Sequence, residues 1–317
     1  MKFPVFDLHC DTALELLGRN FQKIGSLREN KLHIDLNRVK DFPAYVQCFA
    51  CFTSDTKTLP IGVEPSELFQ REKTAILSQI EANQDLINQA FSADDIEKNV
   101  KEGKASAVLT IEGAAGIGFD PDRLEAAYAE GFRISTLGWN ESNSLAGSHK
   151  TGEGLTEEGK RYVRTAQKLG MLIDVSHISD AAFWDIMEIT QAPVIASHSN
   201  SRAVWDISRN LTDDMFLAIC NTGGVVGINL YAHFLGEDAD LDTVCDHMLH
   251  FLALDPSGKH IALGGDLDGC EELPKGFDGV QDYQMLAQRL LERGVKENVV
   301  MDIFWNNAFD LMKRTWK

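Results

Sequence analysis

The amino-acid sequence predicts a single-domain α/β protein, a (β/α)8 barrel of the TIM type that spans residues 1–317. Three observations lead to this prediction: eight short apolar runs, amphipathic segments between most of them, and a length that suits one barrel with insertions. Strands that alternate with helices form parallel βαβ units, and eight such units close into a barrel.

The eight apolar runs each have the length of a buried strand. They cover residues 3–8, 45–52, 105–111, 132–137, 171–176, 193–197, 224–230 and 260–265. Helical patterns lie between them, most clearly at 68–87, 157–170, 181–190, 241–254 and 282–294. Ser92 and Thr212, each followed by acidic residues, indicate helix starts, and Gly170 indicates a helix end.

The connection after the first run is unusually long. Residues 13–44 exceed what one strand-to-helix connection needs, so we expect extra helix and loop over the barrel mouth. No low-complexity linker or internal repeat divides the chain, which favours one domain.

Composition excludes several classes of partner. The formal net charge of −18 argues against nucleic-acid or anionic-membrane binding, because both need concentrated Lys and Arg. Asp7 interrupts the first apolar stretch, and no run approaches the roughly 20 apolar residues that span a bilayer. These features predict a soluble, cytoplasmic protein with reduced cysteines. Cys48 and Cys51 form a CxxC inside an apolar run, which we interpret as a buried strand.

Six ionisable residues follow five of the predicted strands, and two of the six follow the first strand. They are His9, Asp11, Glu112, His177, His198 and Asp266. Barrel enzymes place their active sites at the carboxyl ends of the strands, so these side chains should converge on one cavity. A single histidine after a strand is more often structural, and an acid before glycine is usually a turn residue, as we expect for Asp268. The joint occurrence favours a site.

The spacing of these residues suits two metal ions. Residues i and i+2 of a strand share a face, so His9 and Asp11 can bind one ion together while Cys10 points away. The carboxylate of Glu112 has two oxygens and can bridge two ions, and His177 and His198 would complete the second site. We therefore expect two Zn²⁺ ions per chain, bridged by Glu112 and a water or hydroxide, with the open position of catalytic zinc.

The order of the motifs resembles the membrane (renal) dipeptidase family, peptidase family M19, within the amidohydrolase superfamily. The matching segments are residues 7–12, 109–113, 174–179, 196–202, 209–214 and 264–269. The resemblance implies the same two-zinc ligand set and makes Asp266 the acid that transfers a proton. It also implies that Arg209 holds the terminal carboxylate of the substrate, with Arg202 as a nearby competitor.

One segment departs from the family. Trp139 stands where mammalian members carry a histidine that contacts the substrate, and Trp offers one donor and no titratable nitrogen. Asn140 or Asn143 could supply a donor instead, although a structural role is as well supported. Tyr231 is expected to line the substrate pocket near the seventh run.

The function expected from the resemblance is a zinc-dependent dipeptidase. A metal-bridged hydroxide would attack the amide of a dipeptide, including dipeptides with a D-residue at the carboxyl end, and Asp266 would pass the proton to the leaving amine. The family also implies a homodimer. Two alternatives stay open: an amidohydrolase acting on lactones, cyclic amides or N-acyl amino acids, and a non-catalytic metal-binding homologue.

Overall fold

A parallel β-sheet forms the centre of the protein in a computed structural model that describes residues 2–18, 25–54 and 63–316. Eight of its strands follow the order β7-β6-β5-β4-β2-β1-β9-β8. The ninth strand, β3, lies off this path and pairs with β4. The strands are β1 (Val5–Cys10), β2 (Tyr45–Phe52), β3 (Ile87–Gln89), β4 (Ala105–Glu112), β5 (Phe132–Thr136), β6 (Leu172–Asp174), β7 (Val194–Ile195), β8 (Val226–Ile228) and β9 (Ile261–Leu263). Ala196, just after β7, pairs in parallel with Val226 of β8 and brings the two ends of the sheet together. The predicted (β/α)8 barrel is confirmed.

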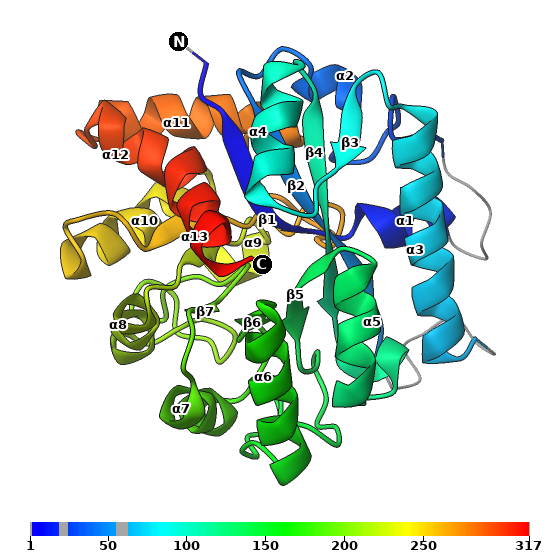
Figure 1. Ribbon diagram of the computed structural model, residues 1–317. Helices are drawn as coiled ribbons and strands as arrows, with labels where there is room; N and C mark the ends of the chain where they lie inside the picture. The colour runs from blue at the N-terminus through cyan, green and yellow to red at the C-terminus, as the bar shows by residue number, and fades with distance from the viewer. Residues whose placement is uncertain (1, 19–24, 55–62, 317) are drawn as a thin grey trace.

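Helices surround the barrel (Figure 1). They are α1 (Thr12–Leu17), α2 (Leu36–Val39), α3 (Pro65–Ala82), α4 (Ala93–Lys101), α5 (Leu124–Ala129), α6 (Glu157–Leu169), α7 (Asp180–Ile189), α8 (Asp213–Thr222), α9 (Ala232–Leu235), α10 (Leu241–Leu254), α11 (Tyr283–Glu292), α12 (Glu297–Met301) and α13 (Asn307–Thr315). A short π-helix, Asp302–Asn306, joins α12 to α13. Within the described part of the chain, no helix has the length and apolar character needed to cross a membrane.

The last helix, α13, closes one end of the barrel. Leu311 and Met312 of α13 belong to the same buried cluster as Phe6 and Val46, which lie near the starts of β1 and β2. Figure 1 shows α13 in front of the strands, with its C-terminal end near the centre of the barrel. The amino ends of the strands are therefore sealed by apolar contacts, which leaves the carboxyl ends for a site.

The predicted helix at residues 68–87 is wrong in its last turn. Helix α3 ends at Ala82, where Asn83 leaves helical geometry and its side chain donates to the carbonyl of Gln79. Residues 87–89 then form β3, whose Ile87 pairs with Ala105 of β4. Three residues are too few to show strand alternation in the sequence.

The three helix boundaries predicted from Ser92, Thr212 and Gly170 are confirmed. The side chains of Ser92 and Thr212 accept hydrogen bonds from backbone N–H groups three residues ahead, and Gly170 ends α6 with a φ of 92°. Cys48 and Cys51 are buried in β2, as predicted.

The long connection after β1 reaches the barrel mouth in part. It contains α1 and α2, and the N–H of His33 donates to the carboxylate of Asp268, in the loop after β9. Residues 19–24 of this connection lie outside the described residues.

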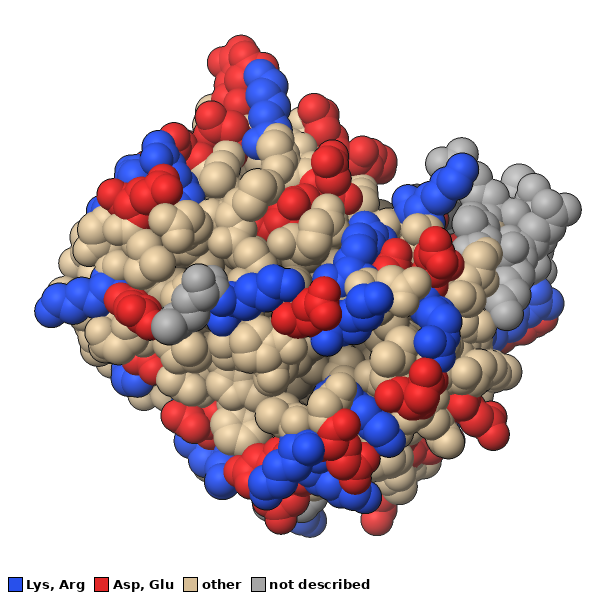
Figure 2. Space-filling model, turned by 90° about the horizontal axis from the view of Figure 1, so that it is seen from above, with Lys and Arg blue, Asp and Glu red and all other residues tan. Residues whose placement is uncertain are grey.

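On the face shown in Figure 2, acidic and basic side chains are interspersed and form no continuous basic patch.

Candidate active site

A cavity of about 570 Å³ opens at the carboxyl ends of the strands. Six of the predicted site residues line it: Asp11, Glu112, Trp139, His177, Tyr231 and Asp266. His9 and His198 are buried, and both approach the Glu112 carboxylate. The fold therefore brings the predicted metal ligands together, although more than 250 positions separate the first from Asp266 in the sequence.

A bulge in β1 directs His9 toward the site. Asp7 pairs with Gln47 of β2 and Cys10 with Phe49, so β1 uses one residue more than its partner. Oδ1 of Asp7 accepts hydrogen bonds from the N–H groups of His9 and Gly265, which stabilises the irregular backbone. Phe6 lies in the barrel interior and His9 points into the same space, which regular alternation forbids for residues three apart.

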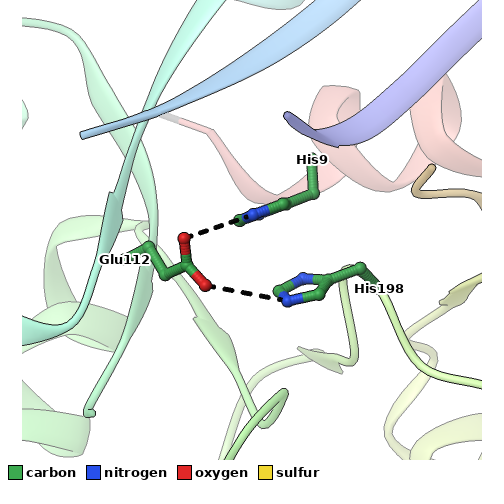
Figure 3. Close-up of side chains that lie close together, drawn as sticks. All are labelled: His9, Glu112 and His198. Atoms are coloured by element: carbon green, nitrogen blue, oxygen red, sulfur yellow. Dashed lines mark ion pairs between the residues drawn. The ribbon is translucent and has the colours of Figure 1, made fainter. Parts of the chain in front are cut away.

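Glu112, the last residue of β4, presents its two oxygens to different histidines. Oε2 lies 3.3 Å from Nε2 of His9, while Oε1 lies 3.1 Å from Nε2 of His177 and 3.8 Å from Nε2 of His198. Figure 3 shows the carboxylate between His9 and His198, with one oxygen toward each ring. This arrangement suits a carboxylate that bridges two cations.

Hydrogen bonds fix the tautomer of His198. The hydroxyl of Ser197 donates to the carboxylate of Asp174, so its oxygen is left to accept from Nδ1–H of His198 at 2.6 Å. Nε2 of His198 then carries the lone pair. Asp174 and Ser197 were not singled out in the sequence, because a hydrogen-bond relay between two strands leaves no local signal.

His177 is oriented in the same way by Asn140. Nδ1 of His177 lies 3.1 Å from Oδ1 of Asn140, which can only accept, so Nε2 again carries the lone pair. The Nε2 atoms of His177 and His198 lie 2.8 Å apart. Two lone pairs at that distance repel each other, and a cation bound between them removes the repulsion.

The donor set fits metal ions on further grounds. Nε2 of His9, Oδ1 of Asp11 and Oε2 of Glu112 are buried polar atoms without a hydrogen-bond partner among the described residues. Two groups of three ligand atoms each lie within 4.8 Å: His9, Glu112 and His198, and His9, Asp11 and Asp266. Burial lowers the pKa of both His177 and His198, which keeps these rings neutral and available as ligands.

Asp266 lies at the edge of the ligand cluster. Oδ1 is 3.8 Å from Nε2 of His9, and Oδ2 accepts a hydrogen bond from Asn229 at 3.0 Å. Burial, together with the nearby charges of Asp11 and Glu112, raises the pKa of Asp266. Asp266 and His177 both have positive φ, 55° and 73°, a strained conformation for these residue types that occurs at functional sites.

The two arginines proposed for substrate binding differ. Arg202 forms a bidentate ion pair with Asp180 on the surface, at 2.7 and 2.8 Å, so it does not face the site. Arg209 is buried, donates to Oγ of Ser199 and to the carbonyl of His198, and leaves its Nε without a partner among the described residues. It is not among the residues that line the cavity, although its guanidinium lies 5.6 Å from the ring of Phe234, which is.

Aromatic and polar side chains form the wall around Trp139. The Trp139 ring meets Phe52 edge-on at 5.0 Å and lies 6.2 Å from the ring of His177. Asn143 has a structural role, because its side chain bonds to backbone groups of residues 137, 145 and 146.

His149 also lines the cavity and was missed in the sequence. Its Nε2 donates to Oδ1 of Asn140, and burial lowers its pKa to about 4, so the ring is neutral. The sequence feature that could have indicated His149 is the pair His149–Lys150 in the loop after β5, since Lys150 also lines the cavity.

The fold and the site together define a metal-binding (β/α)8 barrel of the hydrolase type. The family model described as membrane dipeptidase, peptidase family M19, matches residues 1–316. The chain belongs to this family, as its motifs suggested.

Individual relatives agree. An uncharacterized dipeptidase of Schizosaccharomyces pombe is 34% identical over 236 residues, which cover 71% of this chain and 58% of that protein. A protein of Klebsiella pneumoniae is 34% identical over 261 residues, 78% of this chain and 96% of its own length. Among solved structures, a metallo peptidase from Rhodobacter sphaeroides, bound to a phosphinate mimic of the dipeptide L-Ala-D-Ala, has a TM-score of 0.89 at 26% identity over 100% of both chains.

Proposed function

We propose that this protein is a zinc-dependent dipeptidase. The observation that supports it most is the position of Glu112, whose two oxygens face His9 on one side and His177 and His198 on the other. In this proposal His9, Asp11 and Glu112 hold one Zn²⁺ ion, and Glu112, His177 and His198 hold the other. When bound, the ions would lower the pKa of water and polarise the scissile carbonyl.

The protein side chains would handle the proton and the substrate. Asp266, held by Asn229 and with a raised pKa, would accept a proton from the attacking water and deliver it to the departing amine. Arg209 would bind the terminal carboxylate through donors not used by Ser199 and His198. Trp139, Phe52 and Tyr231 would enclose a small substrate and exclude water.

The substrate class follows from the size and lining of the cavity. A volume of about 570 Å³ suits a dipeptide better than a long chain. The ligand of the Rhodobacter protein is a mimic of L-Ala-D-Ala, which supports including dipeptides with a D-residue at the carboxyl end. The homodimer and the cytoplasmic location stay predictions from the sequence.

A second candidate rests on Arg209. This side chain does not line the cavity and already donates to Ser199 and His198, so a direct contact with a substrate carboxylate is less well supported than the sequence suggests. An amidohydrolase acting on lactones or cyclic amides would need no such contact.

Two substrate panels decide between these functions, each assayed with zinc and with chelator: L-Xaa-L-Xaa and L-Xaa-D-Xaa dipeptides in one, and lactones and cyclic amides in the other. Chelator-sensitive release of amino acids would establish the dipeptidase. Turnover of lactones or cyclic amides without any dipeptide turnover would favour the second candidate. Bound metal without turnover of either class would favour a non-catalytic homologue.

A further inference from the structure

A second group of ligand-type side chains lies at the opposite end of the barrel. Cys220 comes from α8, Asp255 directly follows α10, and His260 directly precedes β9. Their ligand atoms lie within 4.8 Å of one another, and all three side chains are half-buried, which leaves access from solvent. None of them belongs to the proposed active site.

The histidine of this group has a defined tautomer. Nδ1 of His260 lies 2.8 Å from the carbonyl oxygen of Gly224, which can only accept a hydrogen bond. Nδ1 therefore carries the proton, and Nε2 carries the lone pair. A histidine whose other nitrogen donates to a backbone carbonyl is the usual form of a metal ligand, because the hydrogen bond fixes the ring and makes Nε2 more basic.

The carboxylate of the group is also oriented. Oδ1 and Oδ2 of Asp255 accept hydrogen bonds from the N–H and the hydroxyl of Ser257, at 3.1 and 2.8 Å. Each oxygen retains a further lone pair. No Lys or Arg in the described part of the chain forms an ion pair with Asp255, so its negative charge has no cationic partner.

The thiol of Cys220 completes the set. Burial, helped by the charge of Asp255, raises its pKa to about 12, so the metal-free side chain is a protonated thiol. A divalent cation reverses this preference, because a coordinating thiol loses its proton outright. Thiolate, imidazole and carboxylate together suit a borderline-soft cation such as zinc rather than calcium or magnesium.

We propose that Cys220, Asp255 and His260 form a third, non-catalytic metal site that binds zinc. Tetrahedral zinc places its ligand atoms roughly 3.5 Å apart, so atoms within 4.8 Å reach that spacing through small side-chain rotations. The ion would join α8 to the α10–β9 connection at the sealed end of the barrel. Its role is to stabilise this end, since a ligand that binds only the folded state raises the free energy of unfolding.

Cobalt substitution separates this site from the active site. The proposed active-site ligands are His, Asp and Glu, and none of them is a thiolate. A thiolate-to-cobalt charge-transfer band in the purified Co²⁺-loaded protein therefore comes from a cysteine ligand and not from the active site. We expect the band in the wild-type protein and its loss in Cys220→Ser. His260→Gln should weaken Co²⁺ binding at this site by at least about tenfold. The control is His250→Gln, which removes a half-buried histidine that pairs with Asp213 and belongs to no group of three possible metal ligands among the described residues.

Zinc content gives the second measurement. Cys220→Ser and His260→Gln should each hold about one zinc per chain fewer than wild type and His250→Gln, with unchanged hydrolase activity. Absence of the charge-transfer band in wild type, or its persistence in Cys220→Ser, overturns the proposal, as does equal zinc content in all four proteins. These readouts do not depend on dipeptide hydrolysis, so the site and the proposed function fail or stand separately.

Discussion

The side-chain amide of Asn229 donates to Oδ2 of Asp266 at 3.0 Å and also reaches the carbonyl oxygen of His198 at 3.3 Å. One residue of the barrel thus links the proposed proton carrier to a proposed metal ligand. It leaves Oδ1 of Asp266 facing Nε2 of His9. A carboxylate held this way can take up a proton without reorienting.

Asp266→Asn removes the group that accepts the proton while keeping the shape of the side chain. We expect kcat for dipeptides to fall by about a hundredfold to ten-thousandfold, because that is the range for losing a general acid–base group. Metal content should stay near the wild-type value in metal analysis of the same preparation. The exposed Asp238→Asn is the control, and a proportional loss of metal in Asp266→Asn would show that Asp266 acts as a ligand instead.

Glu112→Gln tests the bridging carboxylate. The new amide nitrogen cannot coordinate a cation, so one of the two oxygens that face the histidines is lost. We expect kcat/KM to fall by more than about a hundredfold, with less bound metal per chain. Glu271→Gln changes a carboxylate in the cavity lining without touching the ligand cluster, and it should retain its metal. Full metal content in Glu112→Gln would contradict the bridging role.

Much of this site could be predicted because its residues follow sequence patterns that set their positions. Glu112 directly follows a run that is typical of a buried strand, and His198 and Asp266 follow two more. In a closed barrel the carboxyl ends of all strands meet, so position along each run is enough to predict convergence. The H-x-D pair was predicted for the right place but for an incomplete reason: the β1 bulge, not simple alternation, directs His9 inward.

The residues that were missed depend on contacts between distant segments. Asp174 acts through Ser197, and the side chains of His149 and His177 share Oδ1 of Asn140. Such relays have no spacing rule, since the partners come from different connections. The strand β3 was missed for a different reason: the predicted helix extended to Ile87, the first residue of β3, and three residues are too few to show strand alternation.

Asn140 provides a test of how His177 is positioned. Asn140→Leu removes the acceptor for Nδ1–H of His177, so the ring loses its fixed tautomer, and zinc affinity should fall by about ten- to a hundredfold. Asn140→Asp keeps an acceptor at this point and should restore binding. Competition titrations with a zinc chelator measure both. Equal affinity in the Leu and Asp variants would mean that Asn140 only supports the loop.

Arg209→Lys distinguishes carboxylate recognition from a purely structural role. The planar, forked donors of arginine suit a carboxylate, and losing a charge-assisted hydrogen bond costs about 1.5–3 kcal/mol. We therefore expect kcat/KM for dipeptides to fall by roughly ten- to a hundredfold. Dipeptides with an amidated carboxyl end should be poor substrates of wild type and should lose little more in the variant. An equal loss for both substrate types would indicate that Arg209 serves the fold through Ser199 and His198.

Glu72 of α3 makes stability depend on pH in a predictable direction. Its side chain is fully buried, Oε2 accepts from the N–H of Phe52, Oε1 has no partner among the described residues, and burial raises its pKa well above the ordinary value. The folded state therefore binds this proton more tightly than the unfolded state does. As pH rises above the ordinary pKa of glutamate, the unfolded state ionises first, and the contribution of Glu72 to the free energy of unfolding falls by about 1.4 kcal/mol per pH unit until the folded-state pKa is reached. Glu72→Gln keeps the acceptor and cannot ionise, so its stability relative to wild type should increase with pH over this window.

Urea unfolding at several pH values measures this difference in stability. The exposed Glu81→Gln in the same helix is the control and should show no such difference. A pH-independent difference for Glu72→Gln would refute a buried, protonated carboxyl group.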